Sequence, residues 1–369
     1  MKTHTYYLTR LFSLLLFVGM AGATKAQTYS EQREEGKSFK LKPGAVVQIS
    51  NKYGNVNVLP WEKDSVRIEV TMSAQSKQAA KVVKILSSID VEMLATATSV
   101  SARTVFYDNS ATFWKDVVSY AGQVINTSSN LQISYTVYMP VTNEISIDNK
   151  FGNIYMDSHR AKANISVSNG DLQARNFSSG LKLKIEFGSA SIQDAENIQL
   201  TSNYSDVSIR NVKSITLNSK SSTIEIEQCE ALDITSSRDK LLIKSCNTLS
   251  GDASFSKIRI TELEAVTSMT TKYGELKLNS VSRNFRTIQI KSEFTDIFLG
   301  VNPASGYSID LQYDSKTSLN ISSQINNQLK KETINPKLGT IQATGEIGKS
   351  GTAHISVTAR AGALSMLNK

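Results

Sequence analysis

From residue 149 to residue 299 the chain repeats one short pattern of polar and apolar positions. The unit is an octet that reads small polar, any, aromatic, small, polar, aliphatic, any, aliphatic; residues 149–156 (NKFGNIYM) nearly copy residues 51–58 (NKYGNVNV). Further copies span residues 167–174, 185–192, 202–209, 219–226, 236–243, 253–260, 271–278 and 292–299. The fourth positions follow one another at 17 or 18 residues, with a last spacing of 21. Such an even period predicts a solenoid with one coil per repeat.

Within each repeat the apolar residues alternate with polar ones. One repeat places them at positions that the next repeat reproduces: Val207, Ile209, Val212, Ile215 and Leu217. Alternation predicts strands with one buried face. Seventeen residues are too few for two strands and a crossover helix, so consecutive coils must pair directly. We therefore expect an all-β fold, a parallel β-helix or solenoid with 17–18-residue coils. An antiparallel sandwich is the alternative, although it has no reason to repeat a residue type at one place in every coil.

Equivalent positions of successive coils stack in a solenoid, so each octet position becomes a column. The third position is mostly aromatic and comprises Tyr53, Phe151, Phe187, Tyr204, Phe255, Tyr273 and Phe294, with Asn169, Ser221 and Arg238 as interruptions. An aromatic row suggests sugar binding, but this position has the parity of the aliphatic residues before it. We therefore expect the rings to fill the core. Gly, Ser and Asp at the fourth position predict the tight change of direction, where Gly can adopt a positive φ.

The two cysteines, Cys229 and Cys246, occupy the same corner position in adjacent coils. In-register strands would hold them within disulfide range, and export would allow the bond to form. The alternative is a pair of inward-facing reduced thiols, which the neighbouring column members Val212 and Leu263 favour because both are apolar.

The N-terminus has the features of a signal peptide. Lys2 and Arg10 precede the apolar run 11–20, and small side chains lead to Ala26. We expect cleavage after residue 26, with 21–23 as an alternative site and an uncleaved anchor as the other interpretation. No later stretch is apolar for long enough to span a membrane as a helix. The expected location is therefore the periplasm, the cell surface or the medium.

Charge and motifs restrict the function further. The formal net charge is +8, and removal of residues 1–26 takes away three cations and no acid, which leaves +5. The basic residues are scattered, so no nucleic-acid partner is expected. Only His159 and His354 remain after cleavage, and the common catalytic and metal motifs are missing, so we expect no cofactor and no enzyme. Asp171 and Asp206, two coils and about 10 Å apart, keep one alternative open: a carbohydrate-active β-helix enzyme, either a polysaccharide lyase or a glycosidase.

Residues outside the repeat predict caps. Residues 27–142 contain the first coil and an N-terminal capping region with a short helix at 78–86; 143–300 form the regular solenoid and 301–369 the C-terminal strands and cap. Within 301–369, strands at 306–319 and 353–366 flank an expected polar loop, 326–349. The N-terminal cap also carries five aromatic residues that form a candidate partner-binding patch, with burial as the alternative. They are Phe106, Tyr107, Phe113, Trp114 and Tyr120.

The octet at 51–58, its repetition, and the strand VYMP at 137–140 resemble a β-strand-repeat family of unknown function whose members are adhesin-like proteins exported by Gram-negative bacteria. The resemblance implies a right-handed, single-stranded β-helix at the cell envelope and supplies no catalytic residues. We therefore expect a non-enzymatic structural or adhesin-like protein that binds an envelope glycan or a surface protein, with its oligomeric state left open.

Overall fold

The computed structural model describes residues 28–108, 110, 113, 117, 131–349 and 352–368. This part of the chain is nearly all β, which confirms the predicted class. No helix in it is long and apolar enough to cross a membrane. The predicted signal peptide, 1–26, lies outside the described residues, so cleavage and export stay predictions. The chain divides into two compact units, of which the larger consists of Glu34–Thr71, Asp90–Val105 and Ile133–Lys369.

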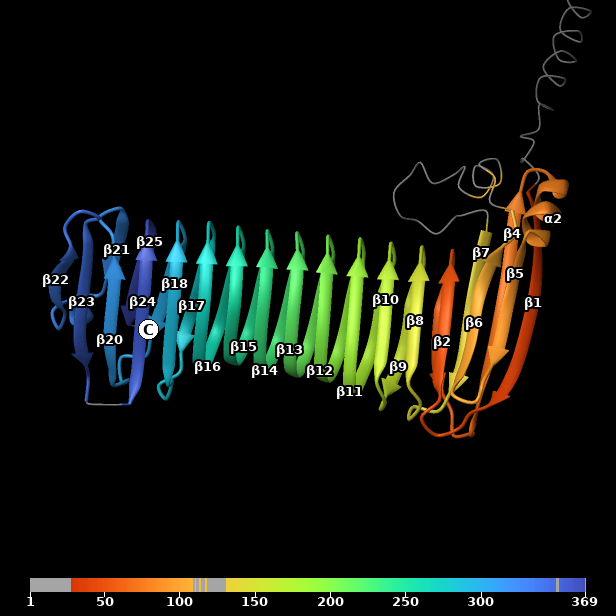
Figure 1. Ribbon diagram of the computed structural model, residues 1–369, viewed down its shortest axis with the longest axis horizontal. Coiled ribbons are helices and arrows are strands. Elements are labelled where there is room, and N and C mark those ends of the chain that lie inside the picture. Colours follow the sequence, from red (N-terminus) through yellow and green to blue (C-terminus); the bar gives the residue numbers. More distant parts are fainter. Residues whose placement is uncertain are drawn as a thin grey trace, which may run out of the picture. The chain divides into compact units, whose positions relative to one another are not determined.

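The regular repeats of the larger unit form a long, mostly parallel sheet (Figure 1). Its strands are β8 (Ile145–Lys150), β9 (Ile154–His159), β10 (Ala163–Ser168), β11 (Leu172–Glu186), β12 (Ser189–Asn203), β13 (Asp206–Lys220), β14 (Thr223–Ser237), β15 (Lys240–Ser254), β16 (Lys257–Lys272), β17 (Glu275–Val281), β18 (Thr287–Glu293) and β19 (Asp296–Val301). Each repeat pairs in parallel with the next at the predicted period, so that Val207 of β13 faces Ile224 of β14. Direct pairing of consecutive repeats is therefore confirmed.

Each repeat buries the five apolar residues that the alternation predicted. Val207, Ile209, Val212, Ile215 and Leu217 are all 5% exposed or less. Burying one such side chain fully is worth about 1.5–3 kcal/mol, and the same columns continue through the neighbouring repeats. The core of the larger unit is thus a set of apolar columns along the sheet.

The first octet of the chain lies next to the repeat at 149. Its strands β2 (Val46–Lys52) and β3 (Val56–Pro60) pair with β8 and β9. On their other side, β2 pairs with β6 (Ser99–Phe106) and β3 with β7 (Leu131–Met139). The remaining N-terminal strands are β1 (Tyr29–Lys40), β4 (Ser65–Ser76) and β5 (Ile89–Ala95).

The smaller unit contains the helix that the sequence predicts at 78–86. Helix α2 spans Ala79–Ser87 and buries Val82, Ile85 and Leu86. Arg33 closes its C-terminal end by donating hydrogen bonds to the carbonyl oxygens of Leu86 at 3.3 Å and Ile89 at 2.8 Å. Cations near a helix C-terminus satisfy carbonyls that lack partners within the helix.

The C-terminal end has an order that the sequence does not reveal. Its elements are β20 (Tyr307–Tyr313), β21 (Thr317–Ile321), α4 (Ser323–Asn326), β22 (Lys330–Asn335), β23 (Thr340–Ile347), β24 (Ala353–Arg360) and β25 (Gly362–Asn368). The last two strands insert into the stack, because β24 pairs with both β18 and β20, and β25 pairs with both β19 and β21.

The prediction of a polar loop at 326–349 is wrong. Strands β22 and β23 form an antiparallel hairpin there, and β23 also pairs with β20. Without this hairpin β20 would expose a row of unpaired backbone groups. Strand β22 then forms the edge, where nearly all of its residues are exposed, and this exposure explains why it lacks an apolar pattern.

Candidate functional site

The corner of each octet is a single residue in the left-handed region. The ten residues at the third position, from Tyr53 to Phe294, have φ between +51° and +67°. Each donates its backbone N–H to the next repeat, as Phe187 does to the carbonyl oxygen of Asn203 at 3.1 Å. The positive φ was predicted at the fourth position and lies at the third, so the prediction is wrong by one residue. Glycine at the fourth position serves a different purpose in some repeats, since a Cβ on Gly170 would lie 2.1 Å from the carbonyl oxygen of Gly152.

A left-handed residue does not follow the alternation of a strand, and the third-position side chains point outward. The prediction that these rings fill the core is wrong. Six of the seven are between 46% and 56% exposed: Phe151, Phe187, Tyr204, Phe255, Tyr273 and Phe294. Large apolar side chains gathered at the surface of a soluble protein commonly mark a binding surface.

The exposed rings stack on one another in three runs. Centroid distances are 5.2 Å for Tyr53–Phe151 and for Phe187–Tyr204, then 5.0 Å for Phe255–Tyr273 and 5.1 Å for Tyr273–Phe294. The rings of each pair are within 12° of parallel. We call these seven residues the aromatic ladder. Within each run it offers a row of apolar ring edges at the corners of successive repeats.

Cations accompany the ladder. The ammonium group of Lys52 lies 4.8 Å from the ring centroid of Tyr53 and 5.8 Å from that of Phe151. Burial, followed by repulsion from Lys150, lowers the pKa of Lys52. The Arg238 guanidinium lies 5.7 Å from the ring centroid of Phe255. In such contacts the electrostatic quadrupole of the ring attracts the cation.

A buried carboxylate, which the sequence patterns did not single out, stabilises the corner where the ladder is interrupted. Asp239 is 4% exposed. Its Oδ2 accepts hydrogen bonds from the hydroxyls of Ser219 at 2.6 Å and Ser236 at 2.7 Å, and its Oδ1 accepts one from the backbone N–H of Ser222 at 2.8 Å. Because buried charges require such partners, Asp239 joins the corners of neighbouring repeats.

The aromatic patch predicted near residue 110 is only partly described. Tyr107 is 65% exposed, whereas Phe113 is 1% exposed and packs against the half-buried Phe106 with centroids 6.3 Å apart. Trp114 and Tyr120 lie outside the described residues. Phe113 therefore contributes to packing, and a binding role for this segment stays a prediction.

Cys229 and Cys246 are register partners on β14 and β15, as the period predicted. Both are buried free thiols. A hydrogen bond with Cys246, and then burial, raises the pKa of Cys229, which disfavours the reactive thiolate. Whether the two sulfurs form a disulfide after export stays a prediction.

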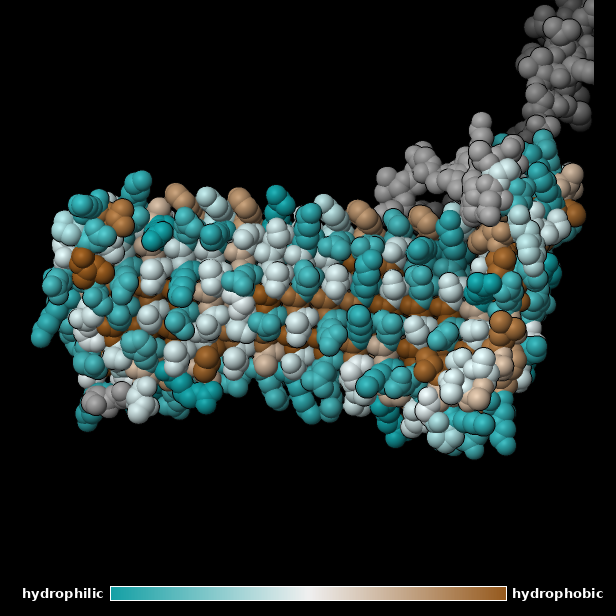
Figure 2. All heavy atoms as spheres, in the orientation of Figure 1, coloured by the Kyte–Doolittle hydropathy of each residue, from teal (hydrophilic) through white to brown (hydrophobic). Residues whose placement is uncertain are grey.

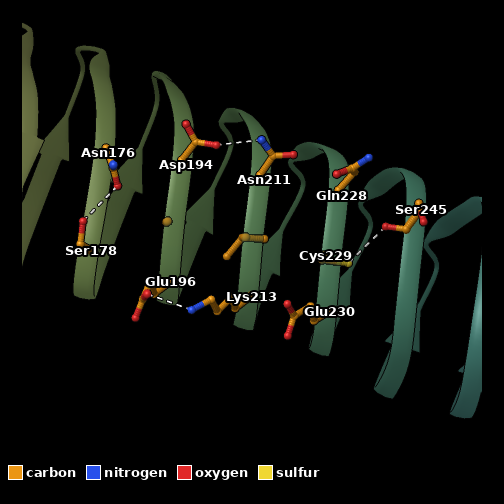
Figure 3. Close-up of a pocket in the computed structure, with 12 residues that line it drawn as sticks. Asn176, Ser178, Asp194, Glu196, Asn211, Lys213, Gln228, Cys229, Glu230 and Ser245 are labelled. Carbon is orange, nitrogen blue, oxygen red and sulfur yellow. Dashed lines mark hydrogen bonds and ion pairs between the residues drawn. The ribbon is translucent and has the colours of Figure 1, made fainter.

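A shallow groove of about 590 Å³ runs beside these cysteines across β11 to β15 (Figure 3). Its polar side chains mostly satisfy one another: Asn211 donates to Asp194 at 2.7 Å, and Lys213 pairs with Glu196 at 2.9 Å. Figure 2 shows the same mixed character on one face of the larger unit, where polar side chains cover most of the surface and apolar residues show between them. Paired groups of this kind join neighbouring repeats.

Of the two carboxylates considered for glycoside chemistry, Asp206 is exposed and Asp171 has structural partners. Asp171 accepts hydrogen bonds from the backbone N–H of Ser189 at 2.9 Å and from its hydroxyl at 2.7 Å. The Oδ1 atom of Asn153 likewise accepts a hydrogen bond from the backbone N–H of Asp171 at 2.9 Å. His159 is 1% exposed, and burial lowers its pKa to about 4. Among the residues that the structure describes, no three His, Cys, Asp or Glu side chains gather so that they could hold a metal ion.

No protein-family model matches the chain, and no curated protein matches it. Solved structures that resemble it include a "putative cell adhesion protein" from Clostridium sporogenes, with 8% identity over 92% of this chain and 100% of that one and a TM-score of 0.19. A "putative lipid binding protein" from Parabacteroides distasonis has 10% identity over 73% and 92% of the two chains and a TM-score of 0.31. A "putative adhesin" from Bacteroides fragilis has 14% identity over 72% and 96% and a TM-score of 0.27. These likenesses are distant, and the function proposed below is argued from the residues of this chain.

Proposed function

We propose that this chain is an exported, non-enzymatic, adhesin-like β-helix that binds a glycan chain at the cell envelope through the aromatic ladder. The observation that carries the proposal is the exposure of the stacked rings at successive corners. We infer that the fold is a right-handed, single-stranded β-helix, because the connection between two parallel strands of one sheet is almost always right-handed.

The aromatic residues at these corners occupy a strained backbone conformation. A non-glycine residue in the left-handed region costs roughly 1–2 kcal/mol. Stacking of a ring pair returns about 0.5–1.5 kcal/mol and the buried part of a ring up to about 2 kcal/mol, so neighbouring repeats hold the rings in place despite the strain. Glycine or asparagine would occupy the corner with less strain. Strained positions that persist along a surface support a functional interpretation.

The chemistry of the ladder suits a polymer of sugars. A sugar ring has an apolar C–H surface and a polar rim, and binding sites for such ligands combine aromatic side chains with a few polar groups. The ladder supplies rings at intervals of 5.0–5.2 Å within each run, together with neighbouring cations such as Lys52 and Arg238. Contacts that repeat along a polymer add through effective concentration, so individually weak contacts can give useful affinity.

The test is a panel of purified neutral and acidic polysaccharides presented to the chain without residues 1–26, with binding and turnover measured on the same samples. We expect binding to at least one polymer with no new reducing ends and no new unsaturated sugars. Binding to none of the polymers would contradict the ladder as a glycan surface. Turnover of any polymer would instead support the polysaccharide lyase or glycosidase.

A further inference from the structure

The aromatic ladder is interrupted between Tyr204 and Phe255, and the octets around this interruption carry four exposed cations: Lys220, Arg238, Lys240 and Lys257. We propose that this basic break binds the anionic groups of an acidic polysaccharide, namely the carboxylate or sulfate groups of its sugars. The inference rests on the proposed glycan-binding function and specifies the class of glycan.

The strand register brings two of these cations together. Lys240 of β15 and Lys257 of β16 are register partners, and in-register strands are about 4.8 Å apart. Like charges directly opposite each other in a sheet are unfavourable. Arg238 lies at the adjacent corner with φ +59° and a guanidinium held over Phe255. All four cations of the basic break are exposed.

Two of the acids near the basic break, Glu275 and Asp239, are engaged elsewhere. Glu275 is the register partner of Lys257, yet its carboxylate pairs with Lys277 at 3.2 Å and Arg259 at 3.5 Å. Asp239 is buried and accepts its hydrogen bonds from serines and backbone N–H groups. Within the described residues, none of the four cations forms an ion pair.

Two lysines elsewhere along the ladder differ in this respect. Lys184 pairs with Glu186 at 3.2 Å, and Lys272 pairs with Glu293 at 3.2 Å. At the corners where Ser221 and Arg238 replace aromatic residues, the cations therefore form no ion pair with an acidic side chain of the described residues. A guanidinium and two ammonium groups on one exposed corner are the donors that carboxylate and sulfate groups prefer.

A bound acidic polymer would use both parts of this surface. Its sugar rings would pack against the run Phe255–Tyr273–Phe294, and an anionic substituent would reach the basic break beside Phe255. Because the cations are exposed, each contact is individually weak and sensitive to salt. The affinity for an acidic polymer would then come from contacts with the run of rings and with the cations together.

The experiment uses the full mature chain and two matched pairs of probes: polygalacturonate with its methyl ester, and dextran sulfate with dextran. We expect the anionic member of at least one pair to bind at least about tenfold more tightly than its neutral partner. The pair that shows the preference identifies carboxylate or sulfate. The double substitution K240Q/K257Q should weaken anionic binding roughly 2- to 30-fold and leave neutral binding unchanged.

The control is K244Q/K291Q, which removes the same charge from two exposed lysines on the strand faces and should change binding less than about twofold. Equal binding of anionic and neutral probes, or equal losses in the two double variants, would overturn the acidic subsite while leaving the ladder function standing. Absence of all binding would overturn both. If K240Q/K257Q fails to fold, Arg238→Gln replaces it, and unchanged anionic binding by that variant would refute the proposal.

Discussion

Replacing Phe187 with glycine and with alanine tests the left-handed corner directly. Phe187 has φ +55°, is 56% exposed and stacks on Tyr204. Both substitutions remove the same ring. Since somewhat less than half of a ring of about 200 Å² is buried, its loss costs at most about 2 kcal/mol, with up to about 1.5 kcal/mol more from the lost stacking.

The two variants differ only in the backbone. Alanine keeps the left-handed strain of about 1–2 kcal/mol. Glycine avoids that strain, but its greater backbone freedom in the unfolded state destabilises the folded chain by about 0.5–1 kcal/mol. We therefore expect the free energy of unfolding of Phe187→Gly to exceed that of Phe187→Ala by about 0.5–1 kcal/mol. At Ser208, an exposed strand position outside the left-handed region, alanine should be the more stable of the two.

Urea unfolding followed by far-ultraviolet circular dichroism measures both pairs. An alanine variant at 187 as stable as the glycine variant would refute the corner geometry. A loss of more than about 4 kcal/mol in both variants would show that the ring belongs to the core.

Three further substitutions test the packing of the repeats by the same urea measurement. Gly170→Ala should cost about 2–3 kcal/mol or more because its Cβ would lie 2.1 Å from a carbonyl oxygen, whereas Gly180→Ala, with nothing within 4 Å, should be neutral; equal effects would contradict the close approach. Thr267→Val should stabilise the chain by about 1 kcal/mol because the Thr267 hydroxyl is buried without a hydrogen-bond partner, and a destabilised variant would show that it has one. His159 has a folded-state pKa lowered to about 4, so the unfolded state binds the extra proton between about pH 6.5 and 4 and stability falls as the pH falls through that window. Between pH 7 and 4.5 the native chain should lose about 2–3 kcal/mol more than His159→Leu, and equal losses would count against a buried neutral imidazole.

The sequence predicts the regular part of the fold well because its information is local. Alternation over a few residues identifies the buried columns, and the period of 17 or 18 residues determines which residues pair, as Cys229 and Cys246 do. The short helix α2 also follows from its own spacing. The insertion of β24 between β18 and β20 depends on contacts between distant segments, which no local pattern records.

The aromatic column shows where the parity argument fails. Side chains alternate between the two faces of a strand only while each residue keeps a φ in the β region. A single left-handed residue changes the direction in which its side chain points. The sequence did contain a contrary signal, because Asn169, Ser221 and Arg238 occupy the same column and would be poorly placed in an apolar core. The basic break was missed for a related reason, since register partners such as Lys240 and Lys257 are separated by a full repeat.

The central claim is that the aromatic ladder is the glycan-binding surface. Isothermal titration of polygalacturonate and of dextran sulfate into the mature chain and into Phe255→Gly/Phe294→Gly tests it most directly, because this double variant removes two exposed rings at corners that glycine tolerates. We predict at least tenfold weaker binding of the probe that the native chain binds, with the β-sheet spectrum retained. Unchanged affinity in a folded double variant would contradict the account.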